Sequence, residues 1–194
     1  MPWAYSAPVR RTTVFLISAC FFGALHLEVS GQTAPSECQS AVRTFLKAPD
    51  EHGVVALNKS DCWGVIGSSN NHLNRLNNLA ATGNRWAAQY SAGHLKELDG
   101  GNLEDALIAL GQFSDHDMED LLMFAHKGLL SKHELADALT MLPLTLTDNP
   151  RAQLNSLDAR RHRVLRVTRA DLQEQRAQAL IAISESLSET RSNQ

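Results

Sequence analysis

The sequence lacks the short motifs by which most enzymes and metal proteins can be identified. It has no GxSxG nucleophile motif, no HExxH zinc motif and no glycine-rich phosphate-binding loop. Its eight histidines are scattered along the chain. We therefore predict no catalytic residue, no metal ligand and no cofactor. Two carboxylates contributed by distant helices would leave no trace in chain spacing, so a hydrolase with a site assembled across helices stays an alternative.

Proline, glycine and aromatic residues are also scarce. The 194 residues include six prolines, eleven glycines and 6% aromatic residues. Leucine and alanine are abundant while β-branched runs are sparse, which favours helices over strands. Neither sign of charge is in large excess, because 18 Lys and Arg face 21 Asp and Glu. This balance gives no support to a nucleic-acid partner or to an intrinsically disordered chain.

The N-terminal segment has the pattern of an export signal. The basic pair Arg10 and Arg11 precedes an apolar run from Thr13 to Leu27, and small residues follow at 29–31. A basic start, an apolar middle and a small-residue end are typical of a secretory signal peptide. The apolar run is shorter than the roughly 20 residues that a membrane-spanning helix needs. We predict a signal peptide over residues 1–31.

Removal of this segment would leave residues 32–194 as a periplasmic or secreted chain without a transmembrane segment. Two variants of export stay open. The sequence Ile17-Ser18-Ala19-Cys20 resembles a lipobox, in which Cys20 would be lipidated, although apolar residues continue past that cysteine. Arg10-Arg11 resembles the start of a twin-arginine signal, although the residues after it depart from the usual continuation.

Cysteine is rare, and its usage agrees with export. Of three cysteines, Cys38 and Cys62 would remain in the mature chain. An even pair in an exported protein is most simply a disulfide. We predict a Cys38–Cys62 bond, which would close a loop of about 25 residues and tie the N-terminal segment to the chain before Trp63.

Apolar residues recur at helical spacing, most clearly between residues 84 and 142. Four segments there each combine a start signal, an apolar stripe and a stop signal. We expect helices over 85–98, from Asn102 as N-cap to Phe113, from a Ser114/Asp117 capping pattern to Ala125, and from a Ser131/Glu134 capping box to Leu142.

The rest of the mature chain gives weaker helix signals. We expect helices over Cys38–Lys47, over 70–81 within the asparagine-rich stretch 58–84, and twice after Pro150. The run Val54–Leu57 fits either a strand or a helix. Residues 32–37 are expected to be loose, and Ser188–Gln194 to be a frayed tail.

These elements predict an all-α protein built as a compact array of antiparallel helix pairs. A weak repeat runs through it, because Asp105-Ala106-Leu107 matches Asp137-Ala138-Leu139 at an offset of 32 residues. A period of this length is what an α-solenoid would show. Unrelated amphipathic helices that share common residues would give the same match.

Charge is unevenly placed in the second half of the chain. Five arginines lie within ten residues: Arg160, Arg161, Arg163, Arg166 and Arg169. The simpler interpretation is a solvated helix face whose arginines pair with acidic residues such as those at 115–120. The functional interpretation is a binding surface for a protein or an anionic envelope component.

We therefore expect an exported helical protein that acts as a binding or protein-interaction module. The alternatives are the hydrolase named above and an inhibitor or immunity-type protein that blocks one partner through the acidic residues 115–120. No sequence feature identifies the partner or a specific activity.

Overall fold

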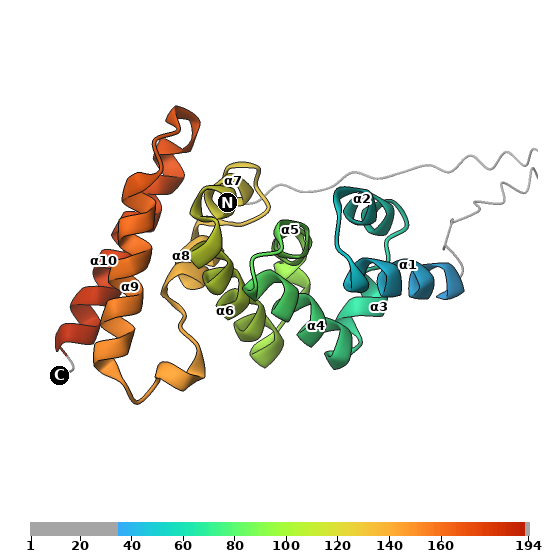
Figure 1. The fold of residues 1–194 in the computed structure, drawn as a ribbon, viewed down its shortest axis with the longest axis horizontal. Helices are drawn as coiled ribbons and strands as arrows, with labels where there is room; N and C mark the ends of the chain where they lie inside the picture. The colour runs from blue at the N-terminus through green and yellow to red at the C-terminus, as the bar shows by residue number, and fades with distance from the viewer. Residues whose placement is uncertain (1–34, 193–194) are drawn as a thin grey trace, which may run out of the picture. The chain divides into compact units, whose positions relative to one another are not determined.

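The computed structural model of the chain describes residues 35–192, and this part is helical without a strand. The all-α class predicted from composition is confirmed (Figure 1). The α-helices are α1 (Pro35–Lys47), α2 (Glu51–Lys59), α3 (Trp63–Gly67), α4 (Asn70–Ala81), α5 (Arg85–Gly93), α6 (Gly100–His116), α7 (Met118–His126), α8 (Lys132–Thr140), α9 (Pro150–Arg166) and α10 (Gln173–Ser192). Short 3-10 turns are η1 (Leu95–Glu97), η2 (Leu144–Leu146) and η3 (Ala170–Leu172).

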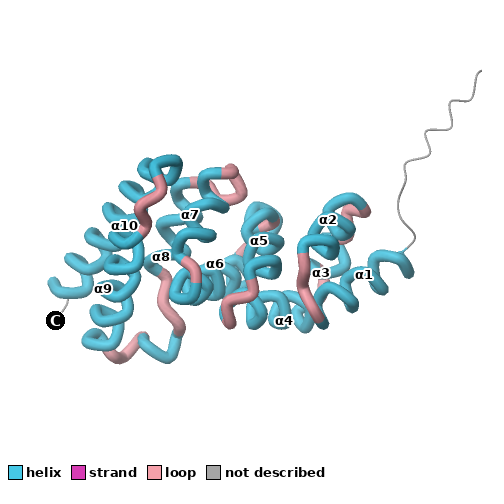
Figure 2. Tube along the Cα trace, turned by 45° about the horizontal axis from the view of Figure 1, so that its top comes forward, coloured by secondary structure: helices cyan, strands magenta, loops and turns pink. Residues whose placement is uncertain are grey.

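Residues 32–194 form one unit in which helices that are not consecutive also pack together. Helix α4 packs against α6, α6 against α8, and α8 against α10, so alternate helices form a row. Helices α9 and α10 lie side by side as an antiparallel pair (Figures 1 and 2). Whether this row repeats in the manner of a solenoid stays a prediction.

The apolar stripes read from the sequence form the core. In α6 the residues Ala106, Leu107, Leu110 and Phe113 are all buried. The stripes of α7 and α8 are buried in the same way, including Leu121, Leu122, Leu135, Ala138 and Leu139. Burial of one face per helix is what stabilises helices of this length, since short helices alone are marginal in water.

Several predicted helix starts are confirmed by their hydrogen bonds. Ser131 and Glu134 form a reciprocal capping box at the start of α8. Asn149 accepts a hydrogen bond from the Ala152 N–H, and Pro150 occupies the first turn of α9. These side chains satisfy N–H groups that have no partner within the helix.

Two predicted caps in α6 and α7 were wrong. Helix α6 begins at Gly100 rather than after Asn102, and Asp99 is its N-cap. Ser114 does not start a new helix: it is buried within α6, and its hydroxyl donates to the Gly111 carbonyl. The next helix starts one turn later, where the Asp117 carboxylate accepts from the Asp120 N–H. Ser114 can bond to its own helix, so its residue type alone did not fix a boundary.

Other boundaries also differ from the sequence pattern. Val54–Leu57 lies within helix α2, which Asp50 caps by accepting from the Gly53 N–H. The helix expected over 85–98 ends at Gly93 and continues as η1. Helix α1 already begins at Pro35, and α10 runs to Ser192 instead of fraying from 188 because Leu187 packs into the core.

The predicted disulfide is present. Cys38, in the first turns of α1, is bonded to Cys62, the residue before α3, and both are buried. The predicted signal peptide over 1–31 and the alternative lipidation at Cys20 lie outside the described residues. Within the described part of the chain, no helix combines the length and the apolar character needed to cross a membrane.

Candidate functional site

The arginine segment predicted from sequence is divided between the interior and the surface. Arg160 is completely buried, with an exposed fraction of 0%. Its guanidinium Nη1 donates to the carbonyls of Leu139 at 3.0 Å and Met141 at 3.1 Å, and more weakly to Ala138 at 3.4 Å. These carbonyls lie at the C-terminal end of α8, where a helix lacks internal donors. Arg160 therefore caps α8 and is not available to a partner.

The other arginines of the segment remain at the surface, and most of them pair with acidic side chains. Arg163 Nη1 lies 3.1 Å from Asp115 Oδ1, and Arg169 Nη1 lies 3.3 Å from Glu119 Oε1. Arg161 approaches Asp158 at 3.8 Å. Arg166 is exposed and makes no ion pair in the described part of the chain. The pairs of Arg163 and Arg169 join the arginine segment to the acidic residues 115–120, and the pair of Arg161 lies within α9, so much of the charge of the segment is compensated within the protein.

The acidic residues 115–120 are likewise engaged in several different contacts. Asp117 caps α7, and Asp120 Oδ2 lies 2.9 Å from Arg85 Nε. Burial raises the pKa of Asp120, and the neighbouring Asp117 carboxylate raises it further. No group of three or more metal-ligating side chains with suitable geometry occurs among residues 35–192.

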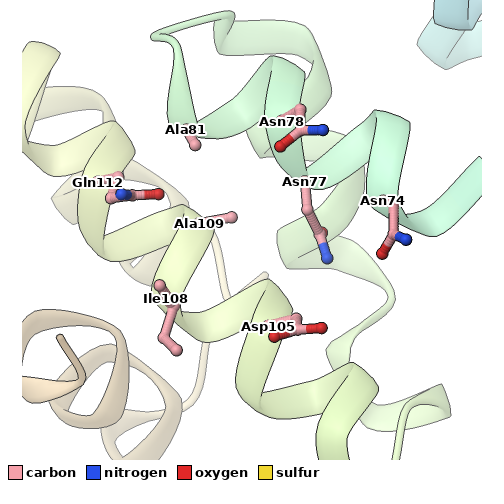
Figure 3. A pocket seen from close by; sticks show the side chains of 8 residues that line it. All are labelled: Asn74, Asn77, Asn78, Ala81, Asp105, Ile108, Ala109 and Gln112. Atoms are coloured by element: carbon pink, nitrogen blue, oxygen red, sulfur yellow. The ribbon is translucent and has the colours of Figure 1, made fainter. Parts of the chain in front are cut away.

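A second surface, which the sequence did not single out, lies between α4 and α6. A pocket of about 300 Å³ opens there. Its lining residues are Asn74, Asn77, Asn78, Ala81, Asp105, Ile108, Ala109 and Gln112 (Figure 3). Five of these eight side chains are polar. The close-up shows Asn74, Asn77 and Gln112 extending into the space between the two helices.

Helical periodicity explains why these residues share one groove. On α4, Asn74 and Asn78 are four residues apart, and on α6, Asp105 and Gln112 are seven apart, so each pair recurs on one helix face. The opposite faces of both helices carry the buried leucines of the core. Packing of α4 against α6 then brings the two polar faces together.

Asn77 is the unusual member of this groove. Its side chain is only 9% exposed, and its Oδ1 atom has no hydrogen-bond partner within the described structure. A buried acceptor without a partner costs about 1–3 kcal/mol. The Oδ1 atom is covered by the protein, and Figure 3 shows the amide nitrogen of Asn77 at the end of the side chain that points into the space between the helices.

The sequence carried one signal for this groove. Residues 58–84 contain seven asparagines, an excess that we noted without assigning a site. Asparagine is a poor helix former, and three of these residues nevertheless lie on one face of α4. The partner face on α6 could not be identified from the sequence, because Asp105 and Gln112 resemble ordinary exposed helix residues.

The chain was compared with protein-family models, curated proteins and solved structures, and none of the three gave a match.

Proposed function

We propose that the protein is an exported binding module that holds an extended polypeptide segment in the groove between α4 and α6. The observation that carries this proposal is the set of carboxamide side chains that line the groove, which are Asn74, Asn77, Asn78 and Gln112. A carboxamide is both donor and acceptor, as is each peptide unit of a main chain. A groove walled by carboxamides therefore suits main-chain recognition.

The spacing of the carboxamides agrees with an extended chain. Asn74 and Asn78 are one helical turn apart, which corresponds to a rise of about 6 Å along α4. Main-chain groups that point to the same side of an extended peptide recur about every 6.6–6.8 Å. Successive asparagines could thus bond to alternate residues of a peptide lying along the helix. Ile108, Ala81 and Ala109 supply apolar contacts beside them.

The groove's chemistry favours binding over hydrolysis. Asp105 is the one ionisable side chain that lines it. Hydrolysis by a general acid and a general base needs two such groups within reach of the substrate. The lining residues supply hydrogen-bonding groups instead, as expected of a site that holds a ligand without changing it.

A peptide-display selection tests the proposal. Random-sequence dodecapeptides would be selected on the wild-type protein, and the affinity of one enriched peptide would then be measured for variants. The double variant Asn74→Ser/Asn78→Ser should weaken binding by about 10- to 100-fold, because two carboxamide anchors are lost. Asn71→Ser, an exposed change on α4 outside the groove, is the matched control and should bind as the wild type does.

Chemical changes in the peptide separate main-chain from side-chain recognition. N-methylation of single peptide amides should abolish binding at alternate positions, whereas alanine substitution of its side chains should have small effects. Failure to enrich any peptide, or equal affinity for the groove variant and the wild type, would rule out this function.

Export itself rests on the Arg10–Leu27 pattern and on the Cys38–Cys62 bond, which is typical of oxidising compartments. The protein recovered outside the cytoplasm should have an N-terminus close to Gln32. An N-terminus at Cys20 carrying a lipid would instead establish the lipoprotein alternative. Arg161 and Arg166 remain candidates for contacts with an anionic envelope component.

A further inference from the structure

We propose that a second pocket, on the other side of α4, binds a tetrahedral oxyanion such as a phosphate group. This pocket has a volume of about 320 Å³. Its lining residues are Gln39, Arg43, Gly64, Val65, Ser68 and His72, from α1, the α3 segment and α4. It is independent of the peptide groove, because the two pockets share no lining residue.

Arg43 is the principal anion-binding group. It is exposed and makes no ion pair or hydrogen bond within the described part of the chain. No carboxylate lines the pocket, so the charge of Arg43 is not neutralised there. A guanidinium fork matches two oxygens of a phosphate, and Gln39, one turn earlier on α1, adds an amide donor beside it.

His72 lines the same pocket as Arg43, and a hydrogen bond fixes the orientation of its ring. Its Nδ1 lies 3.0 Å from the Val65 carbonyl oxygen, so Nδ1 carries the proton of this bond. Nε2 then becomes a donor only in the doubly protonated, cationic ring. Arg43 and His72 are the ionisable side chains that line the pocket, and α3 contributes none.

The disulfide holds the two walls of this pocket together. Cys38 immediately precedes Gln39 on one wall, and Cys62 lies two residues before Gly64 on the other. Because the bond joins α1 covalently to the chain before α3, the donors of α1 are held beside the α3 segment before a ligand arrives. Preorganisation of this kind reduces the entropy lost on binding.

Inorganic phosphate and glycerol phosphate are suitable probes, with backbone amide NMR shifts as the readout. Both should shift the amides of residues 39–43, 64–68 and 72 in a saturable manner. Tighter binding of glycerol phosphate would indicate that the pocket binds the phosphate group of an ester. Equal binding of the two probes would indicate that it binds the free phosphate ion. Arg43→Gln should weaken binding at least about tenfold, because a charge-assisted contact is lost.

Arg166→Gln is the matched control, since Arg166 is also an exposed arginine without an ion pair in the described residues, and it should leave phosphate binding unchanged. Sulfate keeps its charge over the working range and tests the role of His72. His72→Gln should weaken sulfate binding, whereas His133→Gln, at an exposed position outside the pocket, should leave it unchanged. Absence of local shifts, or equal binding by Arg43→Gln, would overturn the proposal.

Discussion

At the scale of single residues, Arg160 shows how one side chain can differ from its neighbours in role. The sequence grouped it with four other arginines as a candidate binding surface, yet it lies inside the protein. Burial lowers the pKa of its guanidinium, and the Asp115 carboxylate, whose Oδ1 lies 3.5 Å from Nε, opposes that effect. Helix periodicity places Arg160 on the same stripe as Leu157 and Val164. Arginine is rarely fully buried, so its residue type argued for the surface until the carbonyls that accept its hydrogen bonds were known.

Replacement of Arg160 by methionine should destabilise the protein. The change keeps much of the side-chain volume but leaves carbonyls at the end of α8 without a donor, so we expect a loss of about 2–4 kcal/mol. Urea denaturation measures this loss. Arg161→Met is the neighbouring control, and it should change stability by no more than about 0.5 kcal/mol because Arg161 is exposed. Equal losses for the two variants would contradict the capping role of Arg160.

Asp120 provides a prediction of pH dependence. Its pKa in the folded protein is raised above the ordinary value of 3.8, first by burial and then by Asp117. Between the ordinary and the raised pKa the folded state binds more protons than the unfolded state, so this group's contribution to stability falls as pH rises. Asp120→Asn removes the titration.

The stability of the wild type relative to Asp120→Asn should therefore decrease as the pH rises above the ordinary pKa of 3.8, as measured by urea denaturation over a range of pH values. An increase over that range would mean that the ion pair with Arg85 outweighs burial.

At the scale of elements, close packing of α6 against α8 depends on Gly111. A Cβ atom at this position would collide with the backbone carbonyl of Ala138 and lie 3.0 Å from both Nη atoms of Arg160. Backbone atoms cannot move aside cheaply, so the absence of a side chain sets the distance between the two helices.

Gly111→Ala should destabilise the protein by about 1–3 kcal/mol despite the better helix propensity of alanine. Gly101→Ala, in the first turn of the same helix, has open space around the added Cβ. It should be neutral or stabilising by up to about 1 kcal/mol. Thermal unfolding of the two variants gives the comparison, and a destabilised Gly101→Ala with an unaffected Gly111→Ala would refute this packing argument.

Helix starts could be predicted from the sequence where the capping residue also caps the helix in the structure. Ser131 with Glu134 forms the predicted capping box, and Pro150 occupies the first turn of α9 as predicted. Ser114 and Asn102 did not, because α6 continues through both positions while the same helix face stays buried. A capping pattern depends only on residues close in sequence. The length of a helix also depends on how much of its apolar face packs against other helices.

At the scale of the whole molecule, the Cys38–Cys62 bond fastens α1 to the rest of the fold. Its two cysteines are 24 residues apart, and α2 lies between them. Constraining a loop of this length in the unfolded chain stabilises the fold by about 3–4 kcal/mol on the chain-entropy view.

Cys38→Ser/Cys62→Ser should therefore lower the free energy of unfolding by about 3 kcal/mol. Thermal unfolding measures the difference. Two free thiols in the denatured, unreduced wild type would contradict the bond itself.

The sequence by itself determined the helical class, the disulfide partners and the identity of most core residues. These follow from periodicity and composition, which are local properties of the chain. Only the tertiary structure decided that Arg160 is internal, that Gly111 fixes a helix contact, and that Asn74, Asn77 and Asn78 face Asp105 and Gln112 across a groove. Each of those facts depends on which helix packs on which, and that is a property of the whole packed chain.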